Sequence, residues 1–300
     1  MTGDNSERRV YGLLGRNISY SLSPAMHNAA FVHHSINAEY RIFDIEEDGL
    51  EDFIRDNVSG GRINGFNVTV PYKMLVKELL YKDPSLEVVS DEWVDLIGAI
   101  NTVRIEGRTV RLANTDTQGF FRSLCRETGF DVKEGQDYLI LGAGGAGRAI
   151  SLYLGMMTRS SRIHVYDIDG EKLLSLKEVF DGNTATLGFD VFGPVSDPKV
   201  MEKILPGCSL VVNATPIGTK AGDPSPVPVE LIDPSAAVYD LVYARETELV
   251  AGAKKRGIRA AGGLGMLVGQ GALSFTIWTG ADTEETRNVM MQAAREKLGS

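Results

Sequence analysis

Cysteine is scarce in this sequence: two residues, Cys125 and Cys208, are too few for a disulfide framework or a four-ligand metal site. His27, His33 and His34 lack the i, i+4 spacing of a chelating pair, so we interpret them as structural or surface residues. No apolar run reaches the roughly 18 residues that a bilayer-spanning helix needs, and the polar N-terminus has no secretory signal. With a net charge of −9 there is no excess of basic residues for nucleic acid. These absences predict a cytoplasmic protein without metal, membrane or nucleic-acid partner.

The most informative stretch that is present begins at Tyr138. A short apolar strand runs into the turn Gly-Ala-Gly-Gly-Ala-Gly, and an apolar helical pattern follows. Gly142 would allow a tight turn, Gly144 close approach to a pyrophosphate, and Gly147 close packing of helix on strand. A second strand ends at Asp167, 20 residues after Gly147 (167 − 147), where a carboxylate takes the ribose hydroxyls. We therefore predict a dinucleotide site; the alternative is a structural glycine turn, because 33 glycines make chance patterns frequent.

The 300 residues, 43% of them hydrophobic, suffice for two domains. Strand and helix patterns alternate on both sides of residue 117, which predicts an α/β protein with parallel or mixed sheets. We expect an N-terminal α/β domain over residues 1–116 and a Rossmann-like dinucleotide-binding domain over residues 117–264. Amphipathic helices within residues 265–300 are expected to pack back on the first domain.

Polar side chains stand where predicted strands of the first half end. Ser21 and Ser23 precede a helix that opens with proline, so they are either turn and cap residues or hydroxyls directed at a polar ligand. Lys73 begins the helix after a buried strand; such a lysine is usually a solvated charge, but α/β proteins bind ligands at this edge. Asn101 and Asp116, taken singly, are more often turn or cap residues.

Read together, these stretches resemble the shikimate dehydrogenase family, which includes the quinate/shikimate dehydrogenases. The resemblance runs from about residue 10 to about residue 280, with every motif in the family's order. The Asn-Val-Thr-Val-Pro-x-Lys motif is particularly specific, because no general rule of dinucleotide binding requires it. The matching stretches are Ser21-Leu-Ser23-Pro24, Asn67-Val-Thr-Val-Pro-Tyr-Lys73, Gly98-Ala-Ile-Asn-Thr102, Asn114-Thr-Asp116, Gly142-Ala-Gly-Gly-Ala146, Asn213-Ala-Thr215 and Gly263-Leu-Gly-Met-Leu-Val-Gly-Gln270.

The resemblance implies reversible reduction of 3-dehydroshikimate to shikimate by a nicotinamide dinucleotide, as in aromatic biosynthesis. It implies Lys73 and Asp116 as the proton-transfer pair, and which of the two moves the proton stays open. The implied substrate contacts are Ser21, Ser23, Thr69, Asn101, Asp116, Tyr243 and Gln270. The implied cofactor contacts are Gly142, Ala143, Gly144, Gly145, Ala146, Asp167, Thr215, Leu241 and Gly263. A site of short hydroxyls and amides suits a polyol carboxylate, because each substrate hydroxyl can find a partner.

This chain departs from the family after the second nucleotide strand. Many members carry Asn-Arg-Thr there, and the arginine takes the 2′-phosphate of NADP; this chain reads Asp167-Ile168-Asp169. Because carboxylates repel a phosphate and suit ribose hydroxyls, we predict NAD in preference to NADP. Two other functions stay open: a quinate/shikimate dehydrogenase of broader specificity, and a non-catalytic dinucleotide sensor, against which Lys73 and Asp116 count. The expected assembly is a monomer or homodimer.

Overall fold

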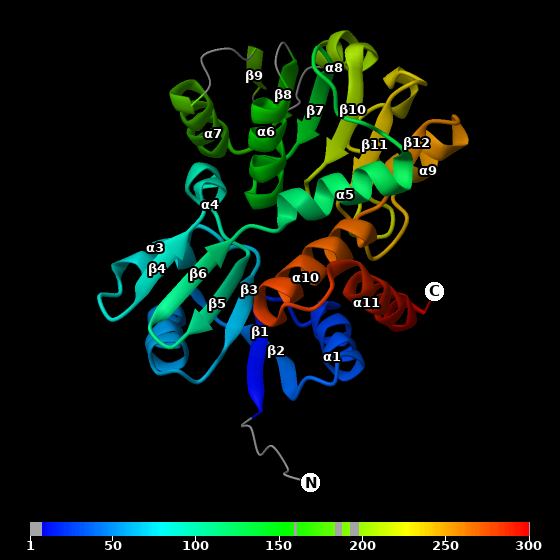
Figure 1. Ribbon diagram of the computed structural model, residues 1–300. Helices are drawn as coiled ribbons and strands as arrows, with labels where there is room; N and C mark the ends of the chain where they lie inside the picture. Colours follow the sequence, from blue (N-terminus) through cyan, green and yellow to red (C-terminus); the bar gives the residue numbers. More distant parts are fainter. Residues whose placement is uncertain (1–7, 159–160, 184–187, 193–197, 300) are drawn as a thin grey trace. The chain divides into compact units, whose positions relative to one another are not determined.

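The computed structural model describes residues 8–158, 161–183, 188–192 and 198–299. The chain forms two compact units, Met1–Thr115 with Val268–Ser300, and Asp116–Leu267. Each unit is built on one six-stranded sheet (Figure 1). The predicted α/β class, with a Rossmann-like sheet in one unit and the C-terminal helices in the other, is confirmed.

The sheet of the first unit is mixed and has the order β2-β1-β3-β5-β6-β4. β1 runs parallel to β2 and β3, whereas β5 is antiparallel to both of its neighbours. All four residues of β3 are buried, as expected for a strand with both faces covered. The strands are β1 (Arg9–Gly15), β2 (Ala38–Asp44), β3 (Gly65–Val68), β4 (Glu87–Ser90), β5 (Thr102–Glu106) and β6 (Thr109–Ala113).

The helices of the first unit come from both ends of the chain, and α1 lies beside α11 (Figure 1). They are α1 (Ser23–His33), α2 (Leu50–Phe53), α3 (Leu75–Lys82), α4 (Glu92–Ile97), α10 (Leu264–Thr279, shared with the second unit up to Leu267) and α11 (Thr283–Leu298). α2 continues directly into a π-helix, η2 (Ile54–Ser59). Ser23 is the first residue of α1 rather than its cap; its backbone N–H donates to Ser21 Oγ at 3.2 Å.

The sheet of the second unit is entirely parallel and has the order β9-β8-β7-β10-β11-β12. Taken in chain order this is 3-2-1-4-5-6, the order of a doubly wound dinucleotide-binding sheet, which binds ligands where the order reverses, here between β7 and β10. The strands are β7 (Asp137–Leu141), β8 (Arg162–Tyr166), β9 (Gly188–Phe192), β10 (Cys208–Asn213), β11 (Ala237–Asp240) and β12 (Arg259–Ala261). The helices are α5 (Asp116–Thr128), α6 (Gly145–Met157), α7 (Gly170–Asn183), α8 (Pro198–Ile204) and α9 (Glu248–Lys255).

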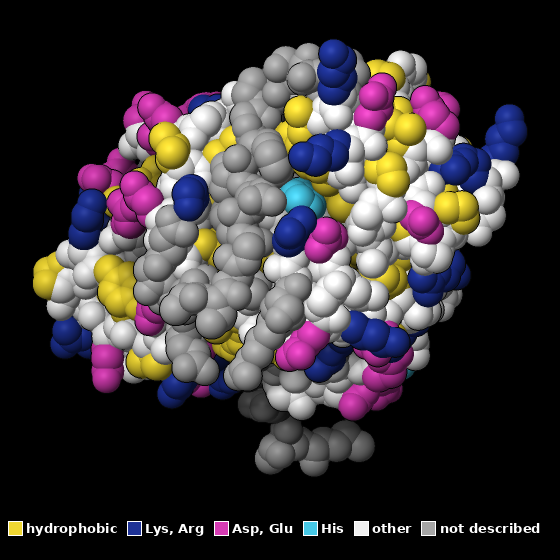
Figure 2. Space-filling model, turned by 90° about the horizontal axis from the view of Figure 1, so that it is seen from above, with side chains coloured by type: hydrophobic (Ala, Val, Ile, Leu, Met, Phe, Trp, Pro, Cys, Tyr) yellow, Lys and Arg dark blue, Asp and Glu magenta, His cyan; other side chains and the backbone are white. Residues whose placement is uncertain are grey.

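The surface carries charges of both signs. Figure 2 shows Lys and Arg side chains interspersed with Asp and Glu side chains over the coloured atoms of one face. Within the described part of the chain, no helix is long and apolar enough to span a bilayer.

Candidate substrate and dinucleotide sites

The amide of Asn101 is buried immediately before β5, and its orientation is fixed by the backbone. Asn101 Oδ1 accepts from the N–H of Thr115 at 2.8 Å, and a backbone N–H can only donate. The amide nitrogen is therefore turned the other way, and it donates to Thr115 Oγ1 at 2.9 Å and to Gln270 Oε1 at 3.3 Å. Asn101 thus directs one N–H donor toward Gln270, an orientation that suits a ligand oxygen atom on that side.

Asn67 and Ser274 connect this amide to β3 and α10. Asn67 Nδ2 donates to the carbonyl of Asn101 at 3.0 Å, to Thr102 Oγ1 at 3.1 Å and to Ser274 Oγ at 2.9 Å. Ser274 Oγ also lies 2.7 Å from Thr102 Oγ1 and 2.9 Å from the carbonyl of Gln270, to which it donates. Buried polar atoms are costly unless they are bonded, so these contacts hold the three segments in one arrangement. No role was predicted for Asn67 or Ser274.

The same network continues from Asn67 toward the start of α1. Tyr40 donates its hydroxyl to Asn67 Oδ1 at 2.8 Å. Burial raises the pKa of Tyr40 well above its ordinary value, and a hydrogen bond with Ser23 opposes that rise. Ser21 Oγ in turn donates to Ser23 Oγ at 3.1 Å. Four of the side chains predicted to contact substrate, those of Ser21, Ser23, Asn101 and Gln270, therefore belong to one hydrogen-bonded network.

Thr69 and Lys73, two further predicted contacts, lie in the turn between β3 and α3, and both are half-buried. The backbone of the turn is anchored to the sheet: Thr69 N donates to the carbonyl of Leu14 at 2.9 Å. The carbonyl of Lys73 accepts from the N–H of Ile100 at 3.0 Å, so the lysine backbone is bonded to the residue that precedes Asn101. The first unit thereby brings the backbone of Lys73 close to the network.

Asp116 and Tyr243 belong to the second unit. Asp116 is 5% exposed and is the first residue of α5, where a carboxylate interacts favourably with the helix dipole. It directly follows Thr115, whose backbone N–H is bonded to Asn101. Tyr243 is half-buried and lies in the segment after β11.

The glycine turn after β7 has the conformation that its sequence predicts. Gly142 has a φ of +98°, and a Cβ there would lie 2.8 Å from the carbonyl oxygen that follows β10. A Cβ at Gly147 would overlap the carbonyl oxygen of Gly142, so only glycine allows α6 to pack this closely. At Gly144, the N-cap of α6, a Cβ would meet nothing within 4 Å. The first N–H groups of a helix lack intrahelical partners, and a helix N-terminus favours an anion. Gly145 and Ala146, two of the predicted cofactor contacts, occupy this position in α6.

A second buried network stands at the carboxyl ends of β10 and β11. Asn213 Nδ2 donates to Asp240 Oδ1 at 3.0 Å, and Thr247 Oγ1 donates to Asp240 Oδ2 at 2.7 Å. Burial raises the pKa of Asp240, and these hydrogen bonds oppose the rise. Asn213 Oδ1 accepts from Thr215 Oγ1 at 2.6 Å, which fixes this predicted cofactor contact. No role was predicted for Asp240, the last residue of β11, or for Thr247, the N-cap of α9.

Leu241 and Gly263, also predicted cofactor contacts, lie against one another. Leu241 N donates to the carbonyl of Asn213 at 2.9 Å, and Gly263 N donates to the carbonyl of Val242 at 2.9 Å. A Cβ at Gly263 would overlap the backbone of Leu241. This close approach explains the need for glycine at position 263.

A doubly wound sheet with a glycine turn, joined to a separate unit with a buried polar network, is typical of a two-domain dinucleotide-dependent oxidoreductase. Residues 13–103 match the shikimate dehydrogenase substrate binding domain, and residues 263–295 match the shikimate 5′-dehydrogenase C-terminal domain. The shikimate dehydrogenase (NADP(+)) of Methanopyrus kandleri is 37% identical over 98% of this chain and 97% of its own. That of Methanothrix thermoacetophila is 37% identical over 97% and 98%.

Solved structures agree with these relatives. The crystal structure of shikimate dehydrogenase from Aquifex aeolicus has a TM-score of 0.81 and 30% identity, covering 97% of this chain and 99% of that one. A shikimate dehydrogenase in complex with NADP+ has a TM-score of 0.80 and 34% identity, covering 96% of each chain. This chain belongs to the shikimate dehydrogenase family.

The predicted preference for NAD over NADP is wrong, since the relatives at 37% identity are named for NADP(+) and a related structure contains NADP+. The prediction assumed that the charges of Asp167 and Asp169 would act on the 2′-phosphate of NADP, but both carboxylates bind other groups of the protein. Asp167 does not stand free: Oδ2 accepts from the N–H of Ala143 at 2.6 Å and Oδ1 from the N–H of Asp169 at 2.9 Å. Asp169 forms an ion pair with Lys172 Nζ at 3.0 Å, and the hydrogen bond to this ammonium lowers the pKa of Asp169. The two carboxylates therefore have structural partners, and a cation lies beside them. Ile168, between them, is 89% exposed.

Proposed function

We propose that this chain catalyses the reversible, NADP-dependent reduction of 3-dehydroshikimate to shikimate. The observation that carries this proposal is the buried network of the first unit, which holds Ser21, Ser23, Asn101 and Gln270. A cyclic polyol acid presents several hydroxyls and a carboxylate, and an array of short hydroxyls and amides can bond each of them. Binding then leaves few polar groups unpaired, which a less hydroxylated ligand would not achieve. Family membership supports the same substrate class.

Each side chain of the first unit has a proposed part in binding. The two serines hold the substrate carboxylate through hydroxyl donors, without placing a bulky charge there. Asn101, whose amide nitrogen is turned toward Gln270, donates to a ring hydroxyl oxygen, and Gln270 and Thr69 bond further hydroxyls. Tyr243 of the second unit is proposed as an additional substrate contact. The network fixes two of these amides before substrate arrives, so less conformational freedom is lost on binding.

Lys73 and Asp116 are proposed as the proton-transfer pair. In the direction of reduction, the Lys73 ammonium gives its proton to the carbonyl oxygen that becomes the new hydroxyl. In oxidation the neutral amine takes that proton back. Asp116 is proposed to orient the substrate hydroxyl by accepting its hydrogen bond.

The second unit is proposed to hold the dinucleotide, whose nicotinamide, when bound, supplies or accepts the hydride. The open position at Gly144 and the first turn of α6 fit the pyrophosphate. Thr215, Leu241 and Gly263 are proposed as further contacts, held by the Asn213 network.

A second candidate is a quinate/shikimate dehydrogenase of broader specificity. The quinate dehydrogenase of Corynebacterium glutamicum, solved in complex with NAD, has a TM-score of 0.79 and 27% identity to this chain. Quinate carries one hydroxyl more than shikimate, and pockets reject an added hydroxyl by only about 10²-fold at best.

The test is a steady-state assay of the purified chain, following the absorbance of the reduced nicotinamide with shikimate or quinate and with NADP or NAD. The highest kcat/KM is expected for shikimate with NADP. A kcat/KM for quinate equal to or above that for shikimate would establish the second candidate. Binding of NADP without turnover of either polyol would refute both and favour a dinucleotide sensor.

A further inference from the structure

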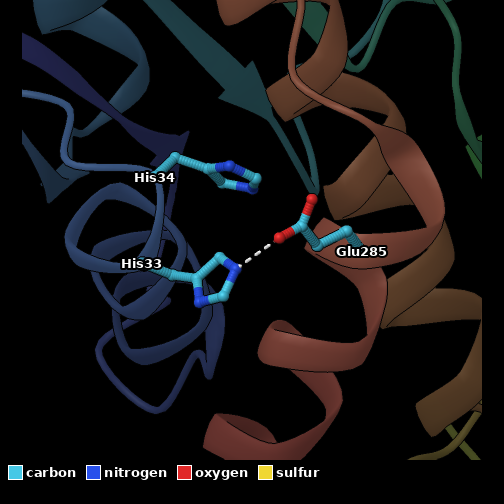
Figure 3. Close-up of side chains that lie close together, drawn as sticks. All are labelled: His33, His34 and Glu285. Carbon is cyan, nitrogen blue, oxygen red and sulfur yellow. Dashed lines mark hydrogen bonds and ion pairs between the residues drawn. The ribbon is translucent and has the colours of Figure 1, made fainter.

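His33, His34 and Glu285 bring three metal-ligand groups together on the first unit (Figure 3). One ring nitrogen of each histidine and one carboxylate oxygen lie within 4.8 Å of one another. His33 ends α1 and His34 follows it, whereas Glu285 stands in the first turn of α11. Sequence spacing did not reveal the cluster, because its carboxylate lies 252 residues from His33.

Contacts with neighbouring side chains hold the two rings near Glu285. His33 Nε2 lies 2.7 Å from Glu285 Oε1, as drawn in Figure 3. His34 Nε2 is 2.9 Å from Thr286 Oγ1, and the ring also lies against Phe275, with 5.5 Å between centroids. A bound ion would replace the contact between His33 Nε2 and Glu285 Oε1 by a bond from each residue to the metal.

The surrounding charges favour a cation. The histidines stand at the C-terminal end of α1, where the helix dipole is negative. The N-terminal end of α11 is positive, but its cap, Asp282, and its first-turn residues Glu284 and Glu285 supply three carboxylates there. Arg287 on the same helix is ion-paired with Glu284 at 3.6 Å. The carboxylates thus outnumber this cation in the turn.

We propose that His33, His34 and Glu285 form a binding site for a divalent transition metal ion, with Zn²⁺ as the best fit. Two imidazole nitrogens and one carboxylate oxygen are ordinary Zn²⁺ ligands, and the fourth tetrahedral position is left to water. Mg²⁺ and Ca²⁺ prefer oxygen ligands, so two imidazoles serve them poorly.

Tetrahedral Zn²⁺ spaces its ligand atoms by about 3.4 Å, given bonds of about 2.1 Å. Small side-chain rotations reach this spacing, because the His33 and Glu285 side chains are 42% and 56% exposed. The bound ion would tie the end of α1 to the first turn of α11.

The test is calorimetric titration of the full-length chain, without an affinity tag or chelator, with Zn²⁺. His33→Ala and Glu285→Gln remove exposed ligands and leave the fold intact. Glu284→Gln is the matched control, because it removes a carboxylate of the same turn that lies outside the cluster. A second control, Cys125→Ser, removes an exposed thiol that could bind Zn²⁺ by itself. Wild type and both controls should bind one ion per chain, and each ligand variant should bind about tenfold more weakly or worse.

Thermal unfolding provides a second measurement. At one fixed Zn²⁺ concentration, the ion should raise the Tm of the wild type and the controls, because it binds the folded chain, and should raise the Tm of the ligand variants less or not at all. Wild-type affinity in both ligand variants, or no saturable binding by the wild type, would overturn the proposal. Loss of binding in Cys125→Ser would also overturn it and would assign the ion to the thiol.

Discussion

Removing the Ser274 hydroxyl tests whether the buried network positions the two amides proposed to bind substrate, those of Asn101 and Gln270. This hydroxyl lies 2.9 Å from Asn67 Nδ2, 2.7 Å from Thr102 Oγ1 and 2.9 Å from the carbonyl of Gln270. In Ser274→Ala, Asn67 Nδ2 keeps its bond to the carbonyl of Asn101 at 3.0 Å, so it is not left without a partner. With about 1 kcal/mol for each net hydrogen bond, the free energy of unfolding should fall by about 1–3 kcal/mol.

The kinetic effect distinguishes positioning from mere stability. Loosening of Asn101 and Gln270 should lower kcat/KM for shikimate about tenfold, which corresponds to about 1.4 kcal/mol of lost transition-state interaction. The KM for NADP should stay unchanged, because Ser274 belongs to the first unit and the glycine turn to the second. Steady-state kinetics with each substrate varied in turn measure both quantities.

Thr276→Val is the matched control on the same helix. Thr276 Oγ1 lies 3.1 Å from the carbonyl of Ala272 and 2.8 Å from Thr283 Oγ1, outside the network. This variant should lose comparable stability in urea unfolding and keep the wild-type kcat/KM for shikimate. If Ser274→Ala also keeps kcat/KM within about twofold, the network does not position the substrate groups, and the reasoning fails.

Three further predictions concern other parts of the chain. Lys73→Ala should lower kcat by roughly 10²–10⁴-fold with a smaller change in KM. The control Lys77→Ala, on the next helix, should keep the wild-type kcat, and a kcat for Lys73→Ala within about threefold of wild type would exclude the proposed role of Lys73 in proton transfer. Gly147→Ala forces a Cβ onto a backbone oxygen and should raise the KM for NADP by at least about threefold. Gly170→Ala, where a Cβ meets nothing within 4 Å, should leave this KM unchanged. Equal KM values in the two variants would refute the packing argument. Burial lowers the pKa of His27 from 6.5 to about 3. Between about pH 6.5 and pH 3 the imidazole therefore takes up a proton in the unfolded chain but not in the folded chain, and the free energy of unfolding falls as the pH is lowered through this range. His27→Phe should remove this loss of stability, which is at most about 1.4 kcal/mol per pH unit. Urea unfolding at several pH values measures the free energy of unfolding, and the same pH dependence in variant and wild type would contradict the prediction.

Local signals sufficed for much of the fold. The strand, turn and helix around Gly142 were predicted because the need for glycine at these positions comes from contacts with residues a few positions away or with the adjacent strand. The C-terminal helices, expected within residues 265–300, are found at Leu264–Thr279 and Thr283–Leu298. The π-helix at Ile54–Ser59 was missed, because an apolar pattern of helical period does not separate α from π hydrogen bonding.

The candidate sites show where a single sequence stops being informative. Asn67 stands between Phe66 and Val68 in a fully buried strand, and a buried amide must find hydrogen-bond partners, so the sequence did hold a signal for it. Its partner Ser274 carried no such signal, because the two are 207 residues apart and the serine resembles any small residue of an apolar helix. The mistaken cofactor prediction has the same origin. The charges at Asp167 and Asp169 could be read from the sequence, but the partners that bind those carboxylates could not. The electrostatic effect of a carboxylate on a ligand depends on the hydrogen bonds and ion pairs that the carboxylate already makes, and the tertiary structure determines those partners.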